Sequence, residues 1–228
     1  MNSKTTINEK LNLNTVSQQG IGKYKLYQFV KRFIDICISG VALFLLSPIL
    51  IIVAVLVYVS DPGKIFYGQL RIGKNGKPFK MWKFRSMYMN ADKMIDQLTD
   101  EQKKQYYTEF KIDNDPRITP IGNFLRKTSL DELPQFFNVL CNDMSLVGPR
   151  PLIESEIQTY YEDTYDTLLA VKPGITGYWQ AYARNNATYQ SGERQKMEMY
   201  YVQHASLWLD TKILFKTIES VLKKQGAQ

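Results

Sequence analysis

The longest apolar run of the chain extends from Ile36 to Val59 and contains no charged residue. As a straight helix, these 24 residues would be about 36 Å long, which is enough to cross the hydrocarbon core of a bilayer. Ser47-Pro48 lies in the middle of the run, where proline removes a backbone hydrogen bond and kinks a helix. Lysine and arginine are frequent on both flanks, and such cations favour the cytoplasmic side of a membrane. The pattern therefore leaves two alternatives, a simple span and a re-entrant hairpin that breaks at Ser47-Pro48.

Asp35 directly precedes the apolar run and follows Lys31 and Arg32 closely. An ionisable group at the edge of the hydrocarbon needs a partner. We expect Asp35 to be a structural anchor, held by Arg32 or by backbone groups at the level of the lipid headgroups.

Polar and apolar positions divide the chain into a tail, a membrane segment and one further body. Residues 1–22 are polar without periodicity and predict a disordered tail, which is followed by the membrane helix over 23–60. Residues 61–228 are enough for one domain with its own hydrophobic core.

The periodicity within 61–228 predicts a mainly α fold with a small β element, which is an α+β class. Strands are expected at 65–67 and 79–87, on either side of a hairpin turn at Asn75-Gly76. Helices are expected at 92–110, 129–141, 153–170 and 192–224, and loops at 143–151 and 172–177. Ser129 and Glu132 fit a capping box at the start of the second helix. The last helix is amphipathic and can pack on a core or lie in the membrane interface.

Composition narrows the chemistry that this body can perform. The net charge of +7 favours anionic partners such as phosphates, nucleotides, acidic lipids or nucleic acid. The only histidine, His204, argues against a histidine-based zinc site and against a Ser-His-Asp triad. The two cysteines, Cys37 and Cys141, have neither metal-ligand nor redox spacing, which is typical of a reducing, cytosolic setting. Acid, base or nucleophile chemistry is therefore left mainly to carboxylates.

The adjacent carboxylates Asp131 and Glu132 are the sharpest local candidate for such chemistry. They open a predicted helix, whose first N–H groups favour carboxylates and phosphates, and Arg126 and Lys127 come just before them. One carboxylate can attack a phosphorus atom while the other holds a divalent metal ion that neutralises phosphates. The alternative is a helix cap with a solvated acidic turn.

Basic residues elsewhere offer candidate phosphate contacts. Arg150 is fixed between two prolines, which lowers the entropic cost of holding its guanidinium against a phosphate, although a surface turn with an incidental arginine explains it equally well. Lys83 and Arg85 lie on a basic strand edge that suits a substrate, a lipid headgroup or plain solvent. Lys172 opens a segment that has the composition of a chain reversal.

Six segments in register along the chain closely resemble the bacterial sugar transferases, which are monotopic polyprenol-phosphate phosphoglycosyl transferases. The resemblance covers about residue 28 to the C-terminus, and the chain looks like the catalytic form without the multi-span N-terminal domain of larger relatives. The segments are KRFID (31–35), SP (47–48), KFRSM (83–87), SLDELPQ (129–135), DMSLVGPRP (143–151) and KPGITG (172–177).

The resemblance implies transfer of a sugar 1-phosphate from a UDP-sugar to undecaprenyl phosphate, with release of UMP. Asp131 is then the nucleophile that forms a covalent phosphosugar intermediate, and Glu132 holds Mg²⁺. Arg126, Arg150 and a basic residue of the Lys83–Arg85 segment contact phosphate. Lys172 stands where some relatives have arginine, so a bidentate phosphate contact there is in doubt.

The resemblance also favours the re-entrant hairpin broken at Ser47-Pro48, with amphipathic interfacial helices around a catalytic domain on the cytoplasmic face of the bacterial plasma membrane. Small exopolysaccharide and capsule enzymes suggest galactose or glucose as the sugar, and a homodimer is one option for the oligomeric state. The competing hypothesis is a non-enzymatic basic membrane adaptor of a polysaccharide-assembly complex. A nucleic-acid binder does not fit the embedded segment and the paired carboxylates.

Overall fold

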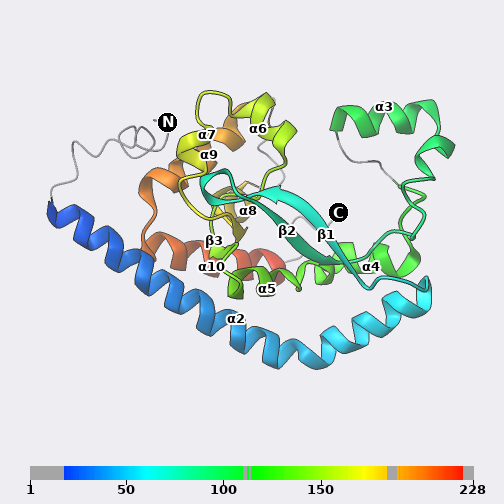
Figure 1. Cartoon of the computed structure of the whole chain (residues 1–228), viewed down its shortest axis with the longest axis horizontal. Helices are drawn as coiled ribbons and strands as arrows, with labels where there is room; N and C mark the ends of the chain where they lie inside the picture. Colours follow the sequence, from blue (N-terminus) through cyan, green and yellow to red (C-terminus); the bar gives the residue numbers. More distant parts are fainter. Residues whose placement is uncertain (1–17, 110–111, 113, 184–188, 190, 223–228) are drawn as a thin grey trace. The chain divides into compact units, whose positions relative to one another are not determined.

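The computed structural model describes residues 18–109, 112, 114–183, 189 and 191–222, and Figure 1 shows the course of the chain. Its α-helices are α2 (Gln18–Ser60), α3 (Asp100–Glu109), α4 (Pro120–Thr128), α5 (Gln135–Leu140), α6 (Glu154–Tyr160), α7 (Tyr165–Leu168), α8 (Tyr178–Tyr182), α9 (Glu193–His204) and α10 (Leu207–Leu222). Its strands are β1 (Phe66–Ile72), β2 (Pro78–Phe84), β3 (Ser145–Val147) and β4 (Gly174–Thr176). Helices predominate over two small sheets, β1-β2 and β3-β4, which confirms the predicted α+β class.

The chain divides into two compact units, which are described separately below. Among the described residues, the larger unit comprises α2 up to Phe44, the stretch Leu70–Met81 and the chain from Gln135 to Leu222. The smaller unit comprises Leu45–Gln69 and Trp82–Pro134. The prediction of one domain over 61–228 stays a prediction.

Helix α2 is the only helix in the described part that is long and apolar enough to cross a membrane, judged by length and composition. Figure 1 shows it as one uninterrupted helix that continues through Pro48, so the structure does not have the expected break at Ser47-Pro48. Large apolar side chains remain exposed along it, for example Phe44 at 78% and Val59 at 70%. The helix begins at Gln18, within the predicted disordered tail, and residues 1–17 of that tail lie outside the described residues.

The larger unit is built around the parallel pair of β3 and β4, in which Ser145 aligns with Gly174 and Val147 with Thr176. Two glycines allow the chain segments to approach this closely. A Cβ atom on Gly174 would lie 2.1 Å from the backbone nitrogen of Gly148, and one on Gly148 would lie 2.4 Å from the Lys172 carbonyl oxygen. Leu146 and Val147 pack with residues of α8, α9 and α10 in the main hydrophobic cluster of this unit.

The KRFID segment of α2 docks into the larger unit through three charged side chains. Lys31 forms an ion pair of 2.8 Å with Asp210 of α10. The Arg32 guanidinium donates to the carbonyl oxygens of Val139 (2.6 Å) and Leu140 (3.0 Å), the last residues of α5, where a cation also complements the helix dipole. Asp35 is buried and accepts a hydrogen bond of 3.0 Å from the Leu146 backbone N–H. The partner of Asp35 is thus a backbone N–H group, which is one of the two kinds of partner predicted for this anchor.

The smaller unit has a core formed by the C-terminal half of α2 and the elements that follow the hairpin. Val53 and Val57 of α2 are buried against Phe84 of β2 and Leu125 of α4. The end of β2 and helix α4 therefore pack on the same hydrophobic core. Both elements carry residues of the candidate site.

The predicted helix over 129–141 is wrong at its start, and the capping box does not form. Ser129 has φ +56° and terminates α4, because its backbone N–H donates to the carbonyl oxygens of Arg126 and Leu125 and its side chain makes no capping bond. A capping serine requires extended backbone angles, whereas a left-handed residue closes a helix C-terminus. A 3-10 helix (Leu130–Glu132) follows, and α5 begins only after Pro134.

Other predicted boundaries differ because short elements give little periodic signal. The expected helix over 153–170 is split into α6 and α7, and that over 192–224 into α9 and α10. The expected loops at 143–151 and 172–177 contain β3 and β4, each only three residues long. The hairpin turn at Asn75-Gly76 is confirmed, with φ of 58° and 74° at its two residues.

Candidate active site

Helix α4 is pressed against the chain segment that leaves β2. The Thr119 backbone N–H donates to the Ser86 carbonyl oxygen at 3.0 Å, and the Thr119 hydroxyl accepts from the Gly122 N–H at 2.9 Å as the cap of α4. A Cβ atom on Gly122 would lie 1.9 Å from the Ser86 carbonyl oxygen, so only glycine fits there. The close approach brings Arg126, on the last turn of α4, within 2.9 Å of the Ser86 hydroxyl through its Nε atom.

A buried arginine fork stabilises the turn before α4. Arg117 donates to both carboxylate oxygens of Asp115, with Nε–Oδ1 at 2.9 Å and Nη2–Oδ2 at 2.7 Å. Burial favours the neutral acid, but the hydrogen bonds from Arg117 outweigh it and lower the pKa of Asp115. The Arg117 carbonyl accepts from the Tyr88 N–H at 3.0 Å, so this ion pair ties the α4 turn to the segment after β2.

The left-handed turn at Ser129 delivers the two adjacent carboxylates, Asp131 and Glu132, in a single 3-10 turn. Asp131 is buried, with 7% of its surface exposed. Glu132 is more open and forms an ion pair of 2.7 Å with the Lys83 ammonium at the end of β2. The structure thus brings three predicted residues into one cluster: Asp131 as the predicted nucleophile, Glu132 as the predicted metal ligand and Lys83 as a predicted phosphate contact. Arg126 is counted with this cluster because its charge acts on Asp131.

Opposing electrostatic effects act on Asp131. Burial is the largest of them and raises the pKa of Asp131 to about 6, and the neighbouring Glu132 carboxylate acts in the same direction. Lys83 and Arg126 lower it in part. Burial likewise lowers the pKa of Arg126, while Asp131 acts against this shift, and an arginine remains charged at neutral pH in any case. The result is a carboxylate that is poorly solvated but ionised at neutral pH, which are favourable conditions for a nucleophile.

Arg85, another predicted phosphate contact, forms its hydrogen bonds with the chain at the end of α2. Its Nη1 atom pairs with Asp61 Oδ2 at 2.9 Å, and its Nη2 atom donates to the Asp61 carbonyl oxygen. Asp61 Oδ2 also accepts from the Met89 N–H at 2.7 Å. These contacts tie the segment after β2 to the end of α2. The phosphate contact of Arg85 stays a prediction.

The remaining predicted phosphate contacts, Arg150 and Lys172, belong to the larger unit. The Arg150 backbone N–H donates to both oxygens of the buried Glu198 carboxylate at 3.3 and 3.2 Å, so α9 holds the proline-flanked loop in place. The Arg150 guanidinium carbon lies 6.0 Å from the centroid of the Trp179 ring. Lys172 donates to the side-chain oxygen of Asn142.

Sequence reasoning missed the aromatic support of this loop. The Arg194 guanidinium carbon lies 4.0 Å from the Trp179 ring centroid and 3.9 Å from that of Tyr189. Burial raises the pKa of Glu198 to about 7, against the N–H of Arg150 and the charge of Arg194. Arg194 and Glu198 are four residues apart on α9, and this helical spacing of opposite charges was the available signal.

Glu132, the predicted metal ligand, offers carboxylate oxygens of the kind that a magnesium ion takes. Mg²⁺ takes oxygen ligands, and in nucleotide sites it uses one or two carboxylates together with substrate phosphates and waters. The described residues contain no group of three or more His, Cys, Asp or Glu that could enclose a metal ion by themselves. A magnesium ion at Glu132 would need further oxygen ligands, such as the phosphate oxygens of a substrate.

Comparison with known proteins identifies the family. A family model described as bacterial sugar transferase matches residues 26–224. The chain is 45% identical over 203 residues to the undecaprenyl-phosphate galactose phosphotransferase of Salmonella typhimurium, covering 88% of this chain and 42% of that protein. It is 41% identical over 197 residues to the UDP-glucose:undecaprenyl-phosphate glucose-1-phosphate transferase of Escherichia coli, covering 84% and 40%.

A shorter relative is matched over most of its length. The chain is 42% identical over 200 residues to the exopolysaccharide production protein ExoY of Sinorhizobium fredii, covering 86% of this chain and 87% of that protein. Against several of its other relatives, the chain spans only about two fifths of their length, 42% in three of them. The match to the family model, over residues 26–224, includes every residue of the Asp131 cluster. The chain therefore belongs to the bacterial sugar transferase family.

Proposed function

We propose that the chain transfers a sugar 1-phosphate from a UDP-sugar to undecaprenyl phosphate and releases UMP. The observation that carries this proposal is the buried Asp131 carboxylate, which lies next to Glu132 and within the electrostatic influence of Lys83 and Arg126. The names of the Salmonella and Escherichia coli relatives, which contain undecaprenyl phosphate and a hexose phosphate transfer, support the same reaction class.

Asp131 acts as the nucleophile in this proposal. Its carboxylate oxygen attacks the phosphorus that carries the sugar, the bond from that phosphorus to the bridging oxygen breaks, and UMP leaves with the electron pair. A phosphate oxygen of undecaprenyl phosphate then attacks the same phosphorus and breaks the aspartyl–phosphate bond, which returns Asp131 as a carboxylate. Two substrates from different phases can thereby use one phosphate site in turn.

The cations and the second carboxylate have separate roles. Lys83 and Arg126 stabilise the negative charge of the transferred phosphoryl group. Arg85, Arg150 and Lys172 are further candidates for phosphate contacts. Glu132 would hold Mg²⁺, which when bound would neutralise charge on the diphosphate.

We also propose that α2 is a re-entrant anchor that enters and leaves the plasma membrane at its cytoplasmic face. The support is Pro48 within an apolar helix, together with lysine and arginine on both flanks. Because α2 is helical through Pro48 in the structure, we propose the anchor as a bent continuous helix and no longer as a helix broken at Ser47-Pro48. Such an anchor keeps Asp131 near a lipid phosphate that cannot leave the interface.

Galactose or glucose is the sugar that we favour, in the first membrane step of exopolysaccharide or capsule repeat-unit assembly. The support comes from the names of relatives, which include a galactose phosphotransferase, a glucose-1-phosphate transferase and exopolysaccharide production proteins. An N-acetylgalactosaminephosphotransferase is also among the relatives, at 38% identity, so the donor panel must include N-acetylated hexoses.

A UMP-release assay tests the proposal. The full chain in detergent is mixed with undecaprenyl phosphate, Mg²⁺ and each of a panel of UDP-sugars, including sugar-labelled UDP-galactose and UDP-glucose. We expect UMP release with at least one donor, and labelled protein when the acceptor is left out. Asp131→Asn should abolish both signals, because an amide cannot form the aspartyl–phosphate bond.

Asp92→Asn is the matched control, since Asp92 is an exposed carboxylate of the same unit. It should retain both signals. Near-normal turnover by Asp131→Asn would exclude Asp131 as the nucleophile. Lipid binding without UMP release from any donor would favour the adaptor hypothesis instead.

A further inference from the structure

The larger unit contains a cavity of about 80 Å³ beside the first half of α2. Its volume is several times the roughly 10–15 Å³ that one water molecule needs. Helix α2 contributes a large part of the wall. The rest comes from Lys74 in the β1–β2 turn, from β3, from the segment before β4 and from the end of α9. The lining residues from α2 are Tyr24, Tyr27, Gln28, Lys31, Arg32 and Asp35.

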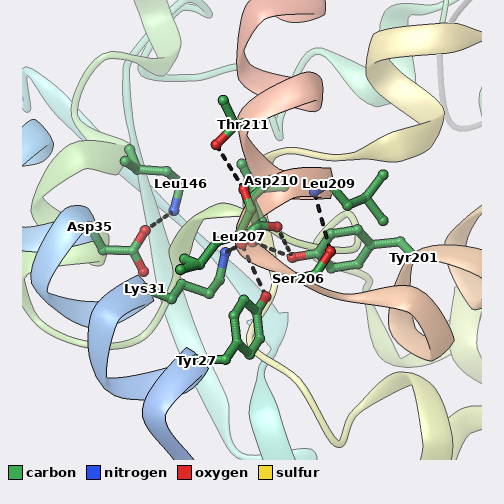
Figure 2. A network of polar contacts seen from close by, with 11 residues as sticks. Tyr27, Lys31, Asp35, Leu146, Tyr201, Ser206, Leu207, Leu209, Asp210 and Thr211 are labelled. Carbon is green, nitrogen blue, oxygen red and sulfur yellow. Dashed lines mark hydrogen bonds and ion pairs between the residues drawn. The ribbon is translucent and has the colours of Figure 1, made fainter. Parts of the chain in front are cut away.

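Four cations line this cavity: Lys31, Arg32, Lys74 and Lys172. Figure 2 shows that Lys31 is already neutralised, because its ammonium pairs with Asp210, which also accepts from the hydroxyls of Tyr27 and Tyr201. Among the described residues, none of the other three cations forms an ion pair with a carboxylate. Arg32 donates to carbonyl oxygens and Lys172 to an amide oxygen, neither of which carries a charge.

The positive charge around the cavity is therefore largely uncompensated. Burial is the main cause that lowers the pKa of Lys172, and repulsion from Arg32, Lys74 and Lys31 adds to it against the opposing charge of Asp35. Burial also lowers the pKa of Lys74. Poorly solvated cations that repel one another are stabilised when an anion enters between them.

One further group of the wall is left unsatisfied. Ser145 of β3 lines the cavity, and its buried hydroxyl has no hydrogen-bond partner. Asp35, a buried carboxylate of the same wall, already accepts a hydrogen bond from the Leu146 N–H. The wall therefore offers donors in excess of acceptors, which suits an anion rich in oxygen atoms.

We propose that this cavity binds a phosphate group through Lys74, Lys172 and Arg32. The phosphate can come from the headgroup of an anionic phospholipid or from inorganic phosphate in the cytosol. The lining residues of α2 precede the uncharged run Ile36–Val59 directly, and two of them are tyrosines, which are enriched at the level of lipid headgroups. This location makes the headgroup the favoured source. The proposal does not depend on the transfer reaction, and it assigns Lys172 to this cavity in place of a contact with the transferred phosphate.

Direct binding measurements test the proposal and separate the two sources. The full chain in a neutral detergent is titrated with dihexanoyl phosphatidylglycerol and, separately, with inorganic phosphate. We expect the phosphatidylglycerol to bind, and Lys74→Gln to weaken its binding about tenfold, as expected for one lost charge-assisted hydrogen bond. Inorganic phosphate with the same sensitivity to Lys74→Gln would extend the site to the free anion.

Lys77→Gln is the matched control, because Lys77 is an exposed lysine of the same hairpin that does not line the cavity. It should change both dissociation constants by less than about twofold. Equal weakening by Lys77→Gln and Lys74→Gln would reduce the effect to general surface charge and overturn the proposal, as would the absence of binding by both ligands. Asp131→Asn should bind phosphatidylglycerol normally, so a failure of the transfer proposal is distinguishable.

Discussion

Asp131 shows how a few neighbours set the chemistry of one residue. Two adjacent carboxylates would ordinarily be solvated, but the left-handed turn at Ser129 directs Asp131 into the unit, while Glu132 is left to meet Lys83. Burial then makes ionisation costly, and the nearby cations recover part of that cost. The outcome is a carboxylate whose pKa of about 6 lies close to the working pH of a cell.

The first prediction is a pH profile. With a pKa of about 6, Asp131 is mostly protonated at pH 5 and mostly ionised at pH 7. A carboxylate nucleophile must be ionised, so the rate of UMP release should rise roughly tenfold between these values. Lys83→Gln removes a charge that lowers this pKa and should move the rise to higher pH.

Lys80→Gln serves as the control for that shift, since Lys80 is an exposed lysine of the same strand. Its profile should coincide with that of the unmodified chain. A rate that stays flat from pH 7 down to pH 5 would contradict the role of Asp131.

The second prediction concerns Glu198 and stability. The pKa of about 7 in the folded chain exceeds the ordinary value of 4.5, so the folded state keeps a proton that the unfolded state has lost. The stabilisation is complete below pH 4.5 and disappears as the pH rises through 7. Between pH 5 and pH 8, the free energy of unfolding of the unmodified chain should therefore fall by on the order of 2–3 kcal/mol relative to that of Glu198→Gln. Parallel thermal midpoints of the two proteins across this range would contradict the prediction.

The sequence predicts single residues well where one short segment carries the signal. Asp131, Glu132 and Arg126 fall within seven positions of one another, so their proximity follows from chain connectivity. The bond from the Arg150 N–H to Glu198 joins residues 48 positions apart and depends on how α9 packs, which no local pattern reveals. The capping box failed for a related reason, since the left-handed angle at Ser129 is imposed by the end of α4.

At the scale of elements, the KRFID segment is the clearest example of pattern and packing acting together. Its three charged side chains reach α10, the end of α5 and β3 separately. The hydrophobic pattern predicted the helix, and the charge pattern predicted that Asp35 is structural. The identity of its partners could not be predicted, because they lie more than a hundred positions away.

The third prediction is that Asp210→Ala destabilises the chain by about 3 kcal/mol or more. The substitution leaves the Lys31 ammonium without its carboxylate, together with two tyrosine hydroxyls that donate to the same group, and an unpaired buried charge is costly. Glu219→Ala on the same helix breaks an exposed pair with Lys216 and should cost less than about 1 kcal/mol. Thermal denaturation in detergent measures both, and equal losses would refute the importance of the Asp210 network.

At the scale of the whole molecule, the sequence predicts the class of the fold and its apolar helix. It does not predict the two compact units, because each is assembled from stretches that are distant along the chain. Helix α2 and the β1–β2 hairpin both contribute residues to each unit. Periodicity describes one element at a time and carries no information on such sharing.

The fourth prediction tests the topology of α2. Reporters placed at the N-terminus and at the C-terminus of the full chain should both be found in the cytoplasm, because a re-entrant anchor returns to the face it entered. A reporter in the β1–β2 turn, for example next to Gly76, provides an internal cytoplasmic reference. Detection of the N-terminal reporter outside the cell, with the C-terminal one inside, would establish a simple span.

The pairing of Lys31 with Asp210 also has a consequence for the order of events during synthesis. The two residues are 179 positions apart, so the ribosome has completed most of the chain before the carboxylate for Lys31 exists. Helix α2 is therefore synthesised while its docking partners are still missing. The last helix pairs with a segment that was made first, so C-terminal truncation before α10 would leave the Lys31 ammonium without its carboxylate.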